Sequence, residues 1–160
     1  MNVQNKEKGF TIIEVVLVLA IAGLIFLMVF IALPALQRNQ RDTARRNDVS
    51  TVASAYTTAT NNNRGTAPTT TTIPSTSFGS TATGVHNFAR YLDDLSDNTT
   101  SVQIRDRGTA TTIPVSDGQI IIVKTAKCGT AGNAVIAGTA RQVAIFTQLE
   151  GGQAVFCQTS

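Results

Sequence analysis

The sequence predicts an α+β protein in which one long N-terminal α-helix packs on a small antiparallel β-sheet of about four strands. Two patterns in the 160 residues carry this prediction. Val15–Leu33 is a run of nineteen residues without a charge, and it is followed by a polar segment with a helical apolar stripe. From Val102 onward the apolar residues recur with a period of two, which is typical of strands. Charged residues make up only 14% of the chain, against about 25% in soluble domains.

The apolar run is long enough to cross a membrane. Nineteen helical residues span about 28 Å, close to the thickness of the hydrocarbon core of a bilayer. The residues at its end, Leu33-Pro34-Ala35, make a poor cleavage site for an ordinary secretory signal, so we expect the span to be retained. Pro34 lacks a backbone N–H, and this predicts a kink or a loosened turn near the end of the span.

The helix continues beyond the apolar run as an amphipathic segment. Val49, Val52, Ala53 and Tyr56 form a stripe at helical spacing, which predicts packing on a sheet. We therefore expect one helix from about Phe10 to Ala59, roughly 75 Å long. Residues 10–34 form its transmembrane or filament-core half, and residues 35–60 form its amphipathic half.

A basic cluster follows the apolar run. Its charges permit a nucleic-acid or lipid-headgroup interface. We favour a solvated helix face, on which nearby acids offset the positive charge. The basic residues are Arg38, Arg41, Arg45 and Arg46, and the acids are Asp42 and Asp48.

Residues 61–100 are predicted to form an exposed, Thr/Ser-rich αβ-loop that contains a short helix. The stretch Thr66–Gly84 has little apolar content, so we expect an irregular connector, with glycosylated or adhesive hydroxyls as the alternative. Apolar residues spaced by three and four predict a short helix at Val85–Leu95. His86 lies off that stripe and is expected to be exposed, and Asn98-Thr99-Thr100 fits the glycosylation sequon.

Residues 101–160 are predicted to form the sheet and a C-terminal disulfide region. Gly151 and Gly152 give a hairpin turn between the last two strands, and the strands together predict an antiparallel meander. The expected strands are Val102–Asp106, Gln119–Thr125, Gln142–Leu149 and Gln153–Cys157.

The two cysteines, Cys128 and Cys157, allow one pairing. A bridge between them would close a loop of about thirty residues and stabilise the fold by roughly 3 kcal/mol. Two reduced, buried thiols are the alternative. We expect no metal site, because the chain has one His and no CxxC. Neither a Ser/His/Asp set nor a phosphate loop is present, and the adjacent Asp93 and Asp94 do not face one site, so no enzyme and no cofactor are predicted.

The N-terminal motif resembles that of a known family. Lys8-Gly9 followed by Phe10-Thr11-Ile12-Ile13-Glu14 and a long apolar helix resembles the prepilin signal of the type IV pilins and pseudopilins. The resemblance implies that residues 1–9 are a leader, which a membrane-embedded prepilin peptidase removes by cutting between Gly9 and Phe10. It also implies N-methylation of Phe10, with the apolar segment kept in the mature protein.

Glu14 matches the acidic residue at the fifth mature position of the family. Phe10 and Glu14 are four residues apart, which would place them on one face of a helix. Cleavage at Gly9 would create a positively charged amine at Phe10. The resemblance implies that Glu14 pairs with the Phe10 amine of a neighbouring subunit. Phe10 of the same chain and the lipid headgroups are the alternative partners.

The resemblance implies a structural subunit, with a major pilin as the leading expectation. Its partners would be copies of itself, prepilin peptidase, the assembly platform and ATPase, minor pilins and membrane lipid, in a filament for adhesion, motility or DNA uptake. The alternatives are a pseudopilin of a type II-like secretion system, a minor pilin, or an anchored binding module that does not polymerise. The positive charges after the span favour a cytoplasmic C-terminal domain. We follow the family, which places that domain outside the cytoplasm before assembly and then on a cell-surface filament, because the expected disulfide needs an oxidising compartment.

Overall fold

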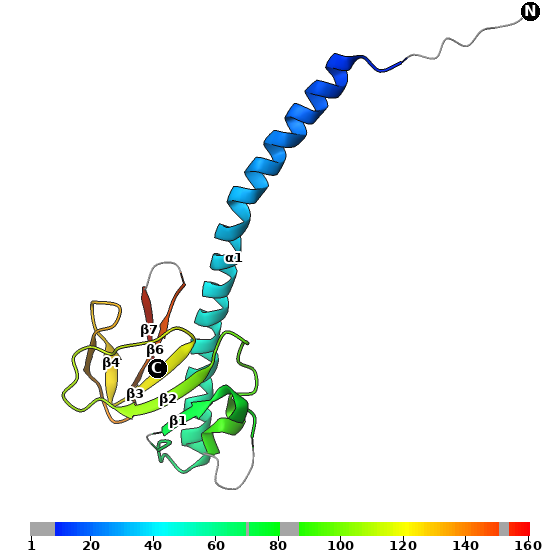
Figure 1. Ribbon diagram of the computed structural model, residues 1–160. Coiled ribbons are helices and arrows are strands. Elements are labelled where there is room, and N and C mark those ends of the chain that lie inside the picture. Colours follow the sequence, from blue (N-terminus) through cyan, green and yellow to red (C-terminus); the bar gives the residue numbers. More distant parts are fainter. Residues whose placement is uncertain (1–8, 70, 81–86, 151–153) are drawn as a thin grey trace, which may run out of the picture. The chain divides into compact units, whose positions relative to one another are not determined.

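The computed structural model describes residues 9–69, 71–80, 87–150 and 154–160. The chain divides into two compact units, Met1–Gln37 and Arg38–Ser160. One helix, α1 (Ile12–Asn62), contributes to both units. The remaining elements follow it in the chain, and Figure 1 labels the helix and most of the strands. They are β1 (Thr71–Pro74), the 3₁₀ helices η1 (Ser75–Ser77) and η2 (Asn87–Tyr91), β2 (Ser101–Asp106), β3 (Gln119–Lys124), β4 (Ala126–Cys128), β5 (Val135–Ala137), β6 (Val143–Gln148) and β7 (Val155–Thr159).

The second unit is built on a five-stranded sheet with the order β1-β2-β3-β6-β7. Three of its four strand pairs are antiparallel, and β2 and β3 are parallel, with Val102 opposite Ile120. A second sheet contains only β4 and β5. The predicted α+β class, with a long helix on an antiparallel-rich sheet, is confirmed.

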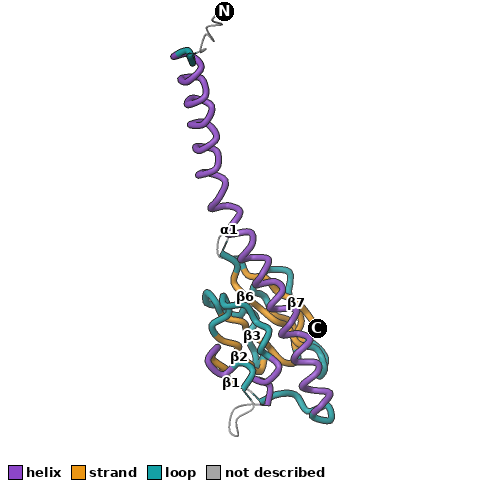
Figure 2. The backbone as a smooth tube through the Cα atoms, turned by 90° about the vertical axis from the view of Figure 1, so that its right-hand side faces the viewer, coloured by secondary structure: helices purple, strands orange, loops and turns teal. Residues whose placement is uncertain are grey.

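The central strand β3 is covered on both faces. Ile120 and Ile122 belong to the core that forms against α1, whereas Ile121 and Val123 belong to a second core. Figure 2 shows the C-terminal part of α1 beside the sheet strands. Burial on both faces is why β3 carries a continuous apolar run, Ile120–Val123, rather than an alternating pattern.

The first core joins the amphipathic stripe of α1 to one face of the sheet. Val49 and Val52 are fully buried, and the rings of Tyr56 and Phe88 meet edge to face with their centroids 6.1 Å apart. Phe88, Ala89 and Leu92 add a layer from η2 and the residue after it. The predicted stripe on α1 is thus confirmed as core packing.

The second core lies on the other face of the sheet. Phe146 and Ala144 of β6 pack there with Val135 of β5, Ala126 of β4 and Ile113 from the segment between β2 and β3. The strand β4 contacts both β6 and β7. The small second sheet therefore closes the face that the helix does not cover.

Several details of the predicted sheet were wrong. The meander of antiparallel strands was wrong, because β2 and β3 pair in parallel and residues 107–118 cross over between them. The strands β1, β4 and β5 were not predicted from the sequence. These strands have only three or four residues, too few for a period of two to be recognised.

The connector before the sheet also differs from the prediction. Thr71–Pro74 is an edge strand rather than part of an exposed loop, and Ile73 is only 1% exposed. The predicted helix over Val85–Leu95 is a shorter 3₁₀ helix, Asn87–Tyr91. Val85 and His86 lie outside the described residues, as does the turn at 151–153. The pairing of β6 with β7 bears out the predicted hairpin.

Candidate functional site at the N-terminal segment

A reciprocal pair of contacts begins α1. Thr11 precedes the first helical residue, Ile12, and its backbone N–H and hydroxyl both donate to Oε2 of Glu14, at 3.1 and 3.0 Å. The Glu14 N–H in turn points to the Thr11 hydroxyl oxygen, at 3.4 Å. This is a capping box, in which the side chains at the N-cap and at the third helical position satisfy free backbone N–H groups.

The capping box corrects the prediction that Phe10 and Glu14 share a helix face. Because Thr11 occupies the N-cap, Phe10 precedes the helix and is 88% exposed. The signal for this was readable in the sequence, because Thr-x-x-Glu before an apolar run is the capping-box pattern. Both contacts of the Glu14 carboxylate use Oε2, and no hydrogen bond to Oε1 is recorded among the described residues.

The predicted cleavage point lies in non-helical, exposed backbone. Gly9, Phe10 and Thr11 are all outside the helix, and Gly9 is exposed. A Cβ added to Gly9 would meet no atom within 4 Å, and the backbone there is not in the left-handed region. The fold of the described chain therefore does not require glycine at this position.

The first unit exposes an extended apolar surface. Apart from Ile136, the exposed large apolar side chains of the described residues all lie between Phe10 and Leu36. The helix contains an 18-residue window with a mean hydropathy of 3.2, none of it buried. Such a surface needs lipid or apolar neighbours to cover it. By length and composition, α1 can cross a membrane, and it runs through Pro34 without interruption.

These features define an α+β protein whose N-terminal helix is long and apolar enough to cross a membrane. The prokaryotic N-terminal methylation motif matches residues 4–30. The chain thus carries the class III signal of the type IV pilins, which supports the pilin and pseudopilin family and indicates a structural protein. No curated protein and no solved structure matches the chain.

The two cysteines form a disulfide in the structure. Cys128 ends β4 and Cys157 lies in β7, and their Cα atoms are 5.9 Å apart. The N–H of Cys128 also donates to the hydroxyl of Thr159 at 3.0 Å. The bridge therefore links the small second sheet to the edge of the large one, and the alternative of two free thiols was wrong.

Three of the four arginines after the apolar run, Arg38, Arg41 and Arg46, are exposed as the sequence suggested, but Arg45 is not. Arg45 is only 4% exposed, and its guanidinium bonds the Gln148 carbonyl at 2.6 Å, Asp117 at 2.7 Å and Glu150 at 3.1 Å. Arg41 also pairs with Glu150, at 2.6 Å. Folding brings these acids to the helix from segments more than seventy residues away, so helical spacing alone could not reveal them.

Asp48 is a second buried anchor rather than an exposed, offsetting charge. It is 4% exposed and accepts bonds from the Ser96 N–H at 3.0 Å, the Ser96 hydroxyl at 2.5 Å and the Thr99 hydroxyl at 2.6 Å. Asp42 accepts from the Glu150 N–H at 2.7 Å. The helix is thus fixed to loops at one end of the sheet, before β2 and β3 and after β6, by side chains that were predicted to lie on its surface.

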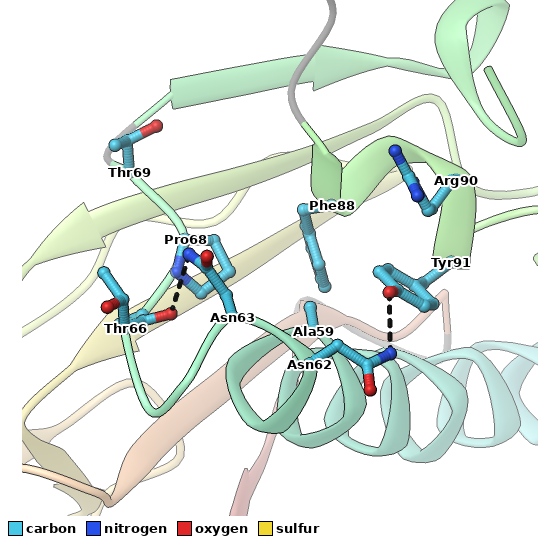
Figure 3. Close-up of a pocket in the computed structure, with 10 residues that line it drawn as sticks. Ala59, Asn62, Asn63, Thr66, Pro68, Thr69, Phe88, Arg90 and Tyr91 are labelled. Carbon is cyan, nitrogen blue, oxygen red and sulfur yellow. Dashed lines mark hydrogen bonds between the residues drawn. The ribbon is translucent and has the colours of Figure 1, made fainter. Parts of the chain in front are cut away.

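The end of α1 borders a pocket of about 320 Å³ (Figure 3). The Asn62 amide donates to the Tyr91 hydroxyl at 2.9 Å, and Phe88 points toward Ala59. The lining is mixed apolar and neutral polar, with one arginine, Arg90. Among the described residues no group of three His, Cys, Asp or Glu side chains is placed to hold a metal ion.

Proposed function

We propose that the chain is the structural subunit of a type IV pilus, a major pilin. It enters the membrane as a prepilin, is cut between Gly9 and Phe10, is N-methylated at Phe10 and polymerises into an extracellular filament. The observation that carries the proposal is the methylation motif at residues 4–30, placed directly before an apolar helix with no buried residue in its span.

The exposed, non-helical backbone at Gly9 supports processing there. A peptidase needs extended backbone at the bond it cuts, and the helix begins only at Ile12. Since a side chain at Gly9 would meet nothing, a requirement for glycine would come from the peptidase and not from the fold. The disulfide Cys128–Cys157 supports an extracytoplasmic C-terminal unit, because such bonds persist in oxidising compartments.

Glu14 has two roles in the proposal. Its Oε2 caps the helix through Thr11, and its Oε1 is offered to the amine that cleavage creates at Phe10 of a neighbouring subunit. Apolar side chains alone give helices little drive to leave lipid, because lipid tails are equally apolar. A charge pair at the N-terminus supplies both part of that drive and the register between subunits.

Processing is tested by expressing the chain with a prepilin peptidase and measuring the N-terminus by mass spectrometry. We expect loss of residues 1–9 and a methylated Phe10 in sheared surface fibres. Gly9→Val should abolish the cut while the fold persists. Gly23→Ala is the matched control, since a Cβ there also meets nothing, and it should be cut normally. A full-length N-terminus found only in membranes would instead support the non-polymerising anchor.

Assembly is tested by two variants that separate the roles of Glu14. Glu14→Gln keeps an oxygen for the capping box and removes the charge. Thr11→Ala removes the cap and keeps the charge. We expect filament yield to fall strongly in Glu14→Gln and only modestly in Thr11→Ala, with both variants inserted and cleaved. Normal fibres from Glu14→Gln would refute the charge pair without affecting the cleavage result.

A further inference from the structure

A second pocket borders the C-terminal end of α1 and contains two arginines. Its volume is about 530 Å³, and the residues that line it include Arg64, Arg141, Asn61 and Tyr56. Arg64 follows the helix, and Arg141 lies just before β6. Volumes of this size are typical of small-molecule sites. We propose that this pocket binds a small oxyanion, namely a phosphate or sulfate group, carried by a sugar or free in solution.

The charge in the pocket is not neutralised by the protein. No carboxylate lines it, and among the described residues neither Arg64 nor Arg141 makes a recorded ion pair. Asp106, whose charge contributes to the raised pKa of Tyr56, is paired with Lys124 at 3.0 Å. Two arginines thus line one pocket, and guanidinium is the side-chain group best matched to tetrahedral oxyanions.

Two hydrogen-bond donors of the pocket are already used within the helix, and a third is available to a ligand. The hydroxyls of Thr57 and Thr60 already donate to helix carbonyls, at 3.0 and 2.8 Å. The Asn61 amide has no recorded side-chain bond among the described residues and stands beside the arginines. An oxyanion would therefore meet two guanidinium groups and an amide. The C-terminus of a helix carries a partial negative charge of about half a unit, which would repel an anion. The two positive charges of the arginines exceed it, so the net interaction with an oxyanion is attractive.

The backbone at Arg64 is a separate observation that points the same way. Its φ is +55°, in the left-handed region that an ordinary side chain disfavours. The three residues before it are asparagines, which take this conformation more easily, and Gly65 follows with φ +84°. An arginine at this position strains the chain and keeps a guanidinium at the pocket. The same conformation ends α1, because the N–H of Gly65 donates to the carbonyl of Thr60 at 2.8 Å, and glycine or asparagine would suit this helix end better than arginine does.

The test is an NMR titration of the oxidised full chain in a nonionic detergent, following the backbone amides of Thr60 and Gly65. Sodium phosphate and sodium sulfate should give saturable shifts, whereas sodium chloride at equal ionic strength should not. Titrations with glucose 6-phosphate and with glucose distinguish an oxyanion carried by a sugar from one that is free in solution. Tighter binding of the sugar phosphate than of phosphate assigns the site to a phosphorylated sugar, and equal binding assigns it to the free anion. Equal shifts with chloride would overturn the proposal.

Two variants complete the test. Arg64→Asn and Arg141→Gln should each weaken phosphate binding by about tenfold, the loss expected for one charge-assisted contact. Arg38→Gln is the charge-matched control, because Arg38 lies about 39 Å from Arg64 along the helix, and it should bind normally. Arg64→Asn should also have an equal or higher Tm, since asparagine tolerates the left-handed region. Unchanged binding in Arg64→Asn, or a lowered Tm with normal binding, would show a purely structural arginine.

Discussion

Replacing Asp48 with alanine should destabilise the second unit more than any change at the exposed acids. Asp48 is 4% exposed and accepts three hydrogen bonds, two from Ser96 and one from Thr99. Thr99 is 4% exposed, so its hydroxyl would be left without a partner and without water, which costs about 2 kcal/mol. Ser96 is half-buried, and each of its two lost bonds costs about 1 kcal/mol. The expected sum is about 4 kcal/mol.

The effect is large enough to measure by thermal unfolding. For a unit of the size of Arg38–Ser160, a loss of about 4 kcal/mol lowers Tm by about 15 °C. The oxidised full chain in nonionic detergent is heated while the near-UV circular dichroism of the tyrosines is followed, and the chain has no Trp to obscure them. Far-UV circular dichroism is not used, because the helix bound to detergent keeps its signal after the rest of the second unit has unfolded.

Two further variants sharpen the result. Asp94→Ala removes an exposed acid and should change stability by less than about 0.5 kcal/mol. Asp48→Asn keeps the shape and one acceptor oxygen but brings two N–H donors into a buried site, so it should lie between wild type and Asp48→Ala. A Tm of Asp48→Ala within about 3 °C of wild type would show that the three bonds contribute little and would refute the reasoning.

The disulfide and the buried Tyr56 each give a further prediction. Replacing both Cys128 and Cys157 with serine should lower the free energy of unfolding by about 3 kcal/mol through loop-closure entropy, measured by urea unfolding, and an unchanged midpoint would contradict this. Burial, together with the charge of Asp106, raises the pKa of Tyr56 to about 12. In Tyr91→Phe, where Tyr56 is the sole tyrosine, absorbance should therefore titrate near pH 12. The fold favours the neutral phenol, so the stability that it contributes should be lost as the pH rises from about 10 to 12. An absorbance titration with its midpoint near pH 10 would contradict this prediction, because it would show that the hydroxyl of Tyr56 is accessible to water.

The elements with strong periodic patterns could be predicted from the sequence. The stripe of Val49, Val52 and Tyr56 specified which face of α1 meets the sheet, and the structure confirms it. The four long strands were located within a few residues, because their apolar residues form patterns long enough to recognise. The short strand at Ile73 was hidden in a Thr/Ser-rich segment, where one buried residue carries no period.

The topology and the polar anchors depended on information that no local pattern holds. The parallel pairing of β2 with β3 follows from a crossover that packs Ile113 beneath the sheet, not from either strand alone. Arg45 looked like a surface residue because its partners Asp117 and Glu150 are distant in sequence. A buried arginine of this kind is recognised only after the fold brings the carboxylates to it.

The N-terminal motif was the most informative part of the sequence, and the structure changes what Glu14 does within it. The sequence suggested that the Glu14 carboxylate pairs with the amine that cleavage would create at Phe10. The capping box with Thr11 shows that the carboxylate already serves the uncut chain, because the first N–H groups of a helix have no intrahelical partners. In lipid, where water cannot replace it, that cap matters more than it would in solution. A substitution such as Glu14→Val removes both roles at once, so its loss of filaments would not reveal which one assembly needs. Only the contrast of Glu14→Gln with Thr11→Ala assigns the defect to the charge or to the helix end.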